Sequence, residues 1–172
     1  TGFDGNDQSA TLYLGDGSGG FTGAEAGLTG VAASSSSLGD VNGDGALDLV
    51  ITGFDGNDRT ATVYLGDGTG GFTDAEAELT GVSISSSSLG DVDGDGDLDL
   101  VITGFDGNDQ SATLYLGDGS GGFTGAEAGL TGVAASSSSL GDVNGDGALD
   151  LVITGFDGND RTATVYLGDG TG

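Results

Sequence analysis

The apolar residues of the chain fall into short runs in which they alternate with polar residues. In the segment 47–52, Leu47, Leu49 and Ile51 occupy every second position, which is the period of a β-strand. Strand-like patterns also cover the segments 11–14, 21–28 and 31–38. Gly-rich turn sequences such as 15–20 separate these runs, and no segment carries a sustained helical period. The pattern therefore predicts an all-β fold.

The strand pattern recurs at a fixed spacing. The sequence Thr-Gly-Phe-Asp-Gly-Asn-Asp begins at Thr1, Thr52, Thr103 and Thr154, 51 residues apart each time. Residues 103–172 are identical to residues 1–70, whereas neighbouring units differ at ten positions, so the full period is 102 residues. Such a period is typical of propellers, solenoids and linear arrays. We divide the chain into units 1–51, 52–102 and 103–153 and a partial unit 154–172.

Four strands in about 50 residues match one blade of a β-propeller. We therefore expect tandem four-stranded antiparallel blades of the β-propeller type. A closed ring of four to eight such blades needs more than the 172 residues present. The chain is accordingly interpreted as an open or linearly stacked array, or a segment of a longer repeat chain. Closure into a ring with further copies and an engineered fragment are the alternatives.

One loop in each complete unit has the composition of a calcium site. The segment 40–48 places side-chain oxygens at loop positions 1, 3, 5 and 9, and the segments 91–99 and 142–150 repeat the pattern. Calcium takes six to eight oxygen ligands, and a backbone carbonyl at position 7 supplies a further one. The candidate ligands are Asp40, Asn42, Asp44, Ala46 and Asp48; Asp91, Asp93, Asp95, Asp97 and Asp99; and Asp142, Asn144, Asp146, Ala148 and Asp150. We expect about one Ca²⁺ per complete repeat, three in all.

These loops fit two other kinds of metal site less well. An EF-hand is excluded because position 12 holds Ile51, Ile102 or Ile153 instead of a bidentate Glu. Magnesium fits less well, since it requires a compact octahedron and keeps its waters. A solvated Asp-Gly turn remains the alternative. The acidic segment 55–58 is interpreted as a hairpin turn, with a second ion site as the alternative, and Asp16 with its copies as turn residues.

The segment 40–53, Asp-Val-Asn-Gly-Asp-Gly-Ala-Leu-Asp-Leu-Val-Ile-Thr-Gly, resembles the FG-GAP/VCBS repeat, the blade unit of integrin-α-type β-propellers. The segment 10–22 resembles the second half of the same repeat, so the resemblance covers essentially the whole chain. It implies that the acidic loop joins two strands of a blade and binds calcium. Gly-Phe-Asp-Gly stands in place of the integrin Phe-Gly and Gly-Ala-Pro elements, so an integrin-like ligand role does not carry over.

Composition excludes several functions. The chain has 28 acidic residues, two basic residues (Arg59 and Arg161) and no His or Cys, with a net charge of −26. A nucleic-acid binder needs a basic face, and the common Ser-His-Asp and Cys-His mechanisms need residues that are absent. No apolar run approaches the length of a membrane span. We therefore expect a non-enzymatic protein.

The repetition, the acidity and the ion loops together predict a structural, calcium-stabilised repeat protein, as a segment of a filament or surface stalk. Its expected location is extracellular or at the cell surface, because loops of this kind suit millimolar calcium. Its expected partners are further identical repeats, by self-association or by continuation of the chain. The alternative is an adhesion or ligand-binding β-propeller module that recognises a glycan or a protein through multivalent weak contacts.

Overall fold

The computed structural model describes residues 1–3 and 7–171, which form fifteen β-strands and no helix. The strands before the first complete sheet are short: β1 (Gly2–Phe3), β2 (Gln8–Ser9), β3 (Leu12–Gly15) and β4 (Phe21–Ala24). The remaining strands are β5 (Ala32–Gly39), β6 (Asp48–Phe54), β7 (Arg59–Gly66), β8 (Phe72–Asp74), β9 (Ser83–Gly90), β10 (Asp99–Phe105), β11 (Gln110–Gly117), β12 (Phe123–Ala126), β13 (Ala134–Gly141), β14 (Asp150–Phe156) and β15 (Arg161–Tyr166).

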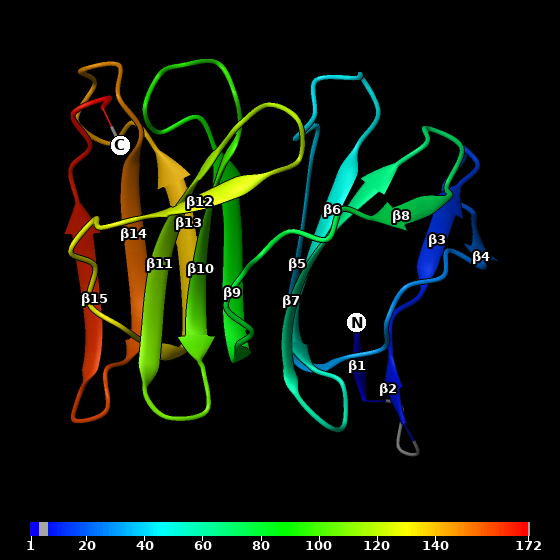
Figure 1. The fold of residues 1–172 in the computed structure, drawn as a ribbon, viewed down its shortest axis with the longest axis horizontal. Helices are drawn as coiled ribbons and strands as arrows, with labels where there is room; N and C mark the ends of the chain where they lie inside the picture. Colours follow the sequence, from blue (N-terminus) through cyan, green and yellow to red (C-terminus); the bar gives the residue numbers. More distant parts are fainter. Residues whose placement is uncertain (4–6, 172) are drawn as a thin grey trace.

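These strands form antiparallel sheets that follow one another along the chain (Figure 1). Two sheets are four-stranded, in the orders β5-β6-β7-β8 and β9-β10-β11-β12, and a third contains β13-β14-β15. The pairs β1-β2 and β3-β4 form small two-stranded sheets at the N-terminal end. The predicted fold class, tandem four-stranded antiparallel blades in an open array, is confirmed for the described part of the chain.

The sheets are out of phase with the sequence units counted from Thr1. Strand β6 runs from Asp48 to Phe54 and so crosses from unit 1–51 into unit 52–102. Each complete sheet takes its first strand from one unit and its third and fourth strands from the next. The repeated sequence therefore continues from one sheet into its neighbour.

The second strand of each complete sheet is buried on both faces. Leu49 and Ile51 of β6 pack toward the N-terminal end, in a cluster with Val31 and Tyr64, whereas Val50 belongs to the cluster on the other face. The alternation seen in the sequence would suit a strand with one solvated face, but β6 from Asp48 to Gly53 is buried throughout. The reason is that each complete four-stranded sheet packs against other parts of the chain on both of its faces.

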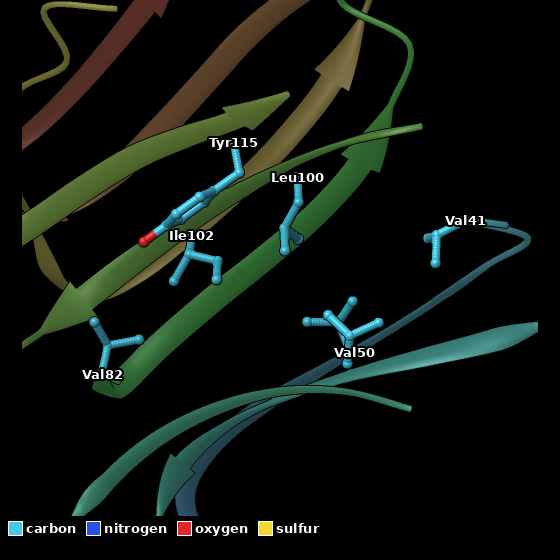
Figure 2. Close-up of a cluster of buried hydrophobic side chains, with 7 residues drawn as sticks. Val41, Val50, Val82, Leu100, Ile102 and Tyr115 are labelled. Carbon is cyan, nitrogen blue, oxygen red and sulfur yellow. The ribbon is translucent and has the colours of Figure 1, made fainter. Parts of the chain in front are cut away.

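The largest cluster lies between sheets β5–β8 and β9–β12. Figure 2 shows Val41 and Val50 from the first sheet region facing Leu100, Ile102 and Tyr115 from the second. Val50 and Leu100 have no exposed surface. Burying a side chain of this size stabilises the fold by roughly 1.5–3 kcal/mol. The apolar contacts between neighbouring sheets thus provide the main cohesion of the array.

Serine residues join the first strands of neighbouring sheets. Ser87 of β9 shares hydrogen bonds with Ser35 and Ser37 of β5, at hydroxyl–hydroxyl distances of 3.2 and 2.7 Å. Ser138 of β13 makes the matching contacts with Ser86 and Ser88, at 3.0 and 2.8 Å. The serine runs therefore lie where first strands approach one another, and their small hydroxyls satisfy each other across the gap.

The segments 55–58 and 67–71 are polar turns. The carboxylate of Asp55 accepts the backbone N–H groups of Asn57 and Asp58, both at 2.8 Å, and closes the β6–β7 hairpin. Asp67 accepts the N–H groups of Thr69 and Gly71 in the β7–β8 turn. The predictions that these acids are turn residues are confirmed by these contacts.

One predicted strand is shorter than expected. The segment 21–28 forms a strand only over Phe21–Ala24, and residues 25–30 run irregularly to β5. Its counterpart before β9 places Ala75, Ala77 and Leu79 against the apolar cluster between the sheets. These alternate side chains pack against the cluster although their backbone does not pair with a strand. The same alternation of apolar residues is typical of a strand, so the sequence predicted a longer one.

Candidate metal centre

Each acidic loop joins the first and second strands of one sheet. The segment 40–48 connects β5 to β6, 91–99 connects β9 to β10, and 142–150 connects β13 to β14. Gly43 and Gly45 have φ values of +70° and +88°, which ordinary residues avoid, so the tight turn depends on glycine. The strands thus hold the ends of each loop, and the glycines allow the backbone between the strands to turn tightly.

The last Asp of each loop is buried and binds two backbone N–H groups from different segments, an arrangement called the Asp clamp below. Asp48 has no exposed surface, and its two carboxylate oxygens accept the N–H groups of Val41 and Gly66, both at 2.8 Å. Asp99 binds Val92 and Gly117 in the same way, at 2.7 and 2.9 Å. Asp150 repeats the arrangement with Val143 and Gly168. This clamp fastens the start of the loop and the end of the third strand to the second strand.

The first and third positions fold the loop on itself. Asp40 accepts the N–H groups of Asp44 and Gly45, at 3.1 and 2.9 Å. The side-chain oxygen of Asn42 accepts the N–H of Asp44, and its amide donates to the Asp44 carboxylate. In the loop 142–150 the amide of Asn144 likewise donates to Asp146, at 2.8 Å. The asparagines therefore hold the position-5 carboxylate by direct hydrogen bonds.

The middle loop carries Asp93 in place of these asparagines and gathers three carboxylates. Within the described residues, oxygens of Asp91, Asp93 and Asp99 lie within 4.8 Å of one another. Burial raises the pKa of Asp99, and the nearby charge of Asp93 acts in the same direction, while the Gly117 and Val92 N–H groups act against both. Carboxylates brought this close repel one another when no counter-ion is present. A divalent cation between them replaces this repulsion with attraction of each carboxylate to the ion.

The fifth and seventh positions are linked through the backbone. The N–H of residue 7 donates to the carboxylate of residue 5, from Ala46 to Asp44 at 2.8 Å and from Asp97 to Asp95 at 2.9 Å. The matching bond from Ala148 lowers the pKa of Asp146, which keeps that carboxylate ionised. In every copy, the side chain of position 5 is therefore held by the backbone N–H of position 7.

All fifteen predicted ligand residues lie in the three described loops, but the structure gives them different roles. Asp91, Asp93 and Asp99 meet as a cluster, and Asp95 and Asp97 are not part of it. The donor set is made only of oxygen atoms, as a hard divalent cation requires. The residues present therefore fit calcium, most directly in the loop 91–99. The double role of the position-9 Asp was not predicted, because its partner Gly66 lies 18 residues further along the chain.

Stacked antiparallel sheets, each with an acidic Asp-Gly loop between its first two strands, define a tandem β-repeat protein. The model of the FG-GAP-like repeat matches residues 40–102 and 91–153. The chain belongs to the FG-GAP-like repeat family. No match to a curated protein was found. In the part of the chain that the structure describes, no helix has the length and apolar character needed to cross a bilayer.

Proposed function

We propose that the chain is a calcium-stabilised structural module of an extracellular repeat protein, working as part of a filament or surface stalk. The observation that carries this proposal is the meeting of Asp91, Asp93 and Asp99 within 4.8 Å in a loop that recurs every 51 residues. An acidic loop that repeats with the sheets suits an ion that supports each sheet, rather than one that serves a single reaction.

In the middle loop, Asp91, Asp93 and Asp95 would supply carboxylate oxygens to the ion, with the Asp97 carbonyl and Asp99 completing the set. Bound calcium would offset the repulsion between these carboxylates. Each oxygen of Asp99 already accepts one backbone N–H, and a carboxylate oxygen has a second lone pair for a cation. An ion bound there would therefore be tied through Asp99 to Val92 and Gly117, and so to strands β10 and β11.

A structural role also agrees with the rest of the surface. The acids outside the loops 40–48, 91–99 and 142–150 include turn residues such as Asp55 and Asp67, whose carboxylates are engaged by their own turns. Successive sheets differ at few positions, so the same surface is presented repeatedly. Both features favour a scaffold over a catalyst, and we propose that the chain is not an enzyme.

Small-angle X-ray scattering in calcium and in excess chelator tests the stiffening. We expect a single elongated particle with calcium and a larger radius of gyration after chelation. Without the ion, the acidic loops are no longer held together, and the net charge of −26 repels the parts of the chain from one another. Magnesium at the same concentration and ionic strength is the control and should restore less of the compact form. Identical scattering in calcium and in chelator would contradict the proposal.

A further inference from the structure

Two of the three acidic loops contain an Asn-Gly step. Asn42 precedes Gly43 and Asn144 precedes Gly145, whereas the middle loop has Asp93 at this position. Asn is a thermolabile residue, because the backbone nitrogen of the next residue can attack its side-chain amide carbon. Glycine has no side chain to shield that nitrogen, and every other Asn of the chain precedes an Asp. The two asparagines are therefore candidate sites of spontaneous deamidation.

The loop activates the side-chain amide of each asparagine for this attack. The N–H of Asp44 donates to Oδ1 of Asn42 at 3.0 Å, and the amide of Asn42 donates to the Asp44 carboxylate at 3.0 Å. A donor at Oδ1 stabilises the negative charge that develops there when a nucleophile adds to the amide carbon. Asn144 makes the same two contacts with Asp146, both at 2.8 Å. The two amides are thus activated alike.

The attacking nitrogen, by contrast, differs between the two loops. The N–H of Gly145 donates to the Asp142 carboxylate at 2.6 Å. In the part of the chain that the structure describes, the N–H of Gly43 donates to no acceptor, and Asp40 accepts the N–H groups of loop positions 5 and 6 instead. Gly43 is also exposed. Attack by Gly145 must first break a short bond to a charged acceptor, whereas attack by Gly43 need not.

This comparison is free of sequence effects. Residues 1–70 and 103–172 are identical, so Asn42 and Asn144 have the same neighbours for many residues on either side. Their intrinsic rates of deamidation in an unfolded chain are therefore equal. Any difference between them in the native chain reports the hydrogen bonding of the folded loops.

We propose that Asn42 is a site of spontaneous deamidation in the folded chain and that Asn144 is protected by the bond from Gly145 to Asp142. The nitrogen of Gly43 bonds to Cγ of Asn42, its proton passes to water, and the side-chain nitrogen leaves as ammonia. The product is a five-membered succinimide ring, which water then opens at one of its two carbonyls. In sum, one water is consumed and one ammonia is released, and no atom is oxidised or reduced.

The position at which the ring opens decides what the loop gains. Opening at Cγ leaves an aspartate at position 3, so the loop 40–48 then carries carboxylates at positions 1, 3, 5 and 9, as the loop 91–99 does. Opening at the backbone carbonyl gives isoaspartate, which lengthens the main chain by one carbon atom. The aspartate product should bind calcium more tightly because ligand charge raises affinity, a consequence that rests on the proposed function.

Peptide mass mapping of the ageing chain is the direct test. Trypsin cleaves this chain only after Arg59 and Arg161, which places Asn42 in fragment 1–59 and Asn144 in fragment 60–161. The chain is incubated at neutral pH in chelator, and tandem mass spectrometry locates each new acid. We expect Asn42 to react roughly tenfold faster than Asn144, since a hydrogen bond to a charged group must break only at Asn144. Equal rates at the two sites, or no reaction at Asn42, would overturn the proposal.

Unfolding the chain in urea is the first control, and it should make the two rates equal. A difference that persists in urea would show that the folded loops are not its cause, which would overturn the proposal. The second control is a pair of variants at the protecting carboxylate. Asp142→Ala removes the acceptor of the Gly145 N–H and should raise the rate at Asn144 toward that at Asn42.

Asp142→Asn is the matched variant, because it keeps a side-chain oxygen that can accept the same N–H and should leave Asn144 slow. Circular dichroism checks that both variants retain the β-sheet signal of the unaltered chain. An unchanged rate at Asn144 in a folded Asp142→Ala chain would contradict the protection. The comparison of Asn42 with Asn144 in the unaltered chain needs no variant and stands if either substitution prevents folding.

Calorimetric titration of Asn42→Asp with calcium separates this inference from the proposed function. We expect one binding event to become tighter than in the unaltered chain, since the variant has the carboxylate that deamidation would supply. If Asn42 deamidates selectively but this variant titrates as the unaltered chain does, the ion-binding role of the loop 40–48 is contradicted and the deamidation site stands. Selective deamidation together with tighter binding supports both.

Discussion

The carboxylate of Asp48 accepts the backbone N–H of Gly66 at 2.8 Å from a fully buried position, and its other oxygen accepts the N–H of Val41. One side chain thus satisfies two backbone donors. It holds together the acidic loop, the second strand and the end of the third strand. The acidic loop is therefore built into the sheet rather than attached to its surface.

Replacement of this clamp should be costly even without metal. Asp48→Ala leaves two buried N–H groups unsatisfied, and we expect a loss of about 3 kcal/mol in the free energy of unfolding. Asp44→Ala removes an exposed carboxylate from the same loop and should cost less than about 1 kcal/mol. Urea unfolding of both variants in excess chelator makes the comparison. Equal losses would show that Asp48 has no special structural role.

The middle loop should bind calcium more tightly than its neighbours. It has carboxylates at positions 3 and 7, where the loop 40–48 has Asn42 and Ala46, and ligand charge raises calcium affinity. The double substitution Asp93→Asn and Asp97→Ala gives it the sequence of the other two loops. Isothermal titration calorimetry should then show the tightest of the binding events replaced by one with the affinity of the rest. An unchanged titration would contradict this ranking.

The serine contacts between first strands should contribute to stability individually. Ser87 is buried and bonds to Ser35 and Ser37, so Ser87→Ala should cost about 1–2 kcal/mol. Ser36 is exposed on the neighbouring strand, and Ser36→Ala should change stability by less than about 0.5 kcal/mol. Chemical denaturation of the two variants compares them. A larger loss for Ser36→Ala would mean that the serine contacts do not hold the strands together.

The turn carboxylates should give stability that is lost in acid. The N–H and hydroxyl of Thr69, with the N–H of Gly71, lower the pKa of Asp67 below its ordinary value of 3.8. The folded state therefore favours the ionised form, and the benefit is present above about pH 4 and disappears as the pH falls through the lowered pKa. Asp118 shows the same direction for the same kind of contacts.

Asp67→Asn and Asp118→Asn together should flatten this acid dependence. We expect the double variant to lose less of its stability between pH 5 and pH 2.5 than the unaltered chain, measured by urea unfolding in chelator. Both chains experience the same relief of general charge repulsion in acid, so the difference isolates the turn carboxylates. A steeper loss in the variant would reverse the assigned sign.

The sequence predicted the elements whose determinants are local. The alternation at Leu47, Leu49 and Ile51 and the Asp-Gly turns indicated strands and hairpins, and the 51-residue period indicated stacked sheets. The two-faced burial of β6 and the pairing of Ser87 with Ser37 depend on contacts between sheets about 50 residues apart. No pattern within one unit encodes these contacts, so they became visible only in the folded chain.

The candidate ion site was predictable in composition but not in detail. Asp or Asn residues at positions 1, 3 and 5 are a local pattern, and the structure places them in one loop. Asp99 lies close to Asp91 and Asp93 because β10 begins at Asp99 and because the N–H of Gly117 holds the Asp99 carboxylate. That anchoring comes from the neighbouring strand, which explains why position 9 was assigned only as a ligand.

Calorimetric titration of the metal-free chain with calcium, paired with thermal unfolding of the same samples, tests the central claim most directly. We predict three ions bound per chain and a rise in Tm, since each site held at 100 times its Kd adds about 2.7 kcal/mol to the free energy of unfolding. The combined variant Asp40→Ala, Asp91→Ala and Asp142→Ala should show neither effect. Absence of binding heat together with an unchanged Tm in calcium and in chelator would contradict the account.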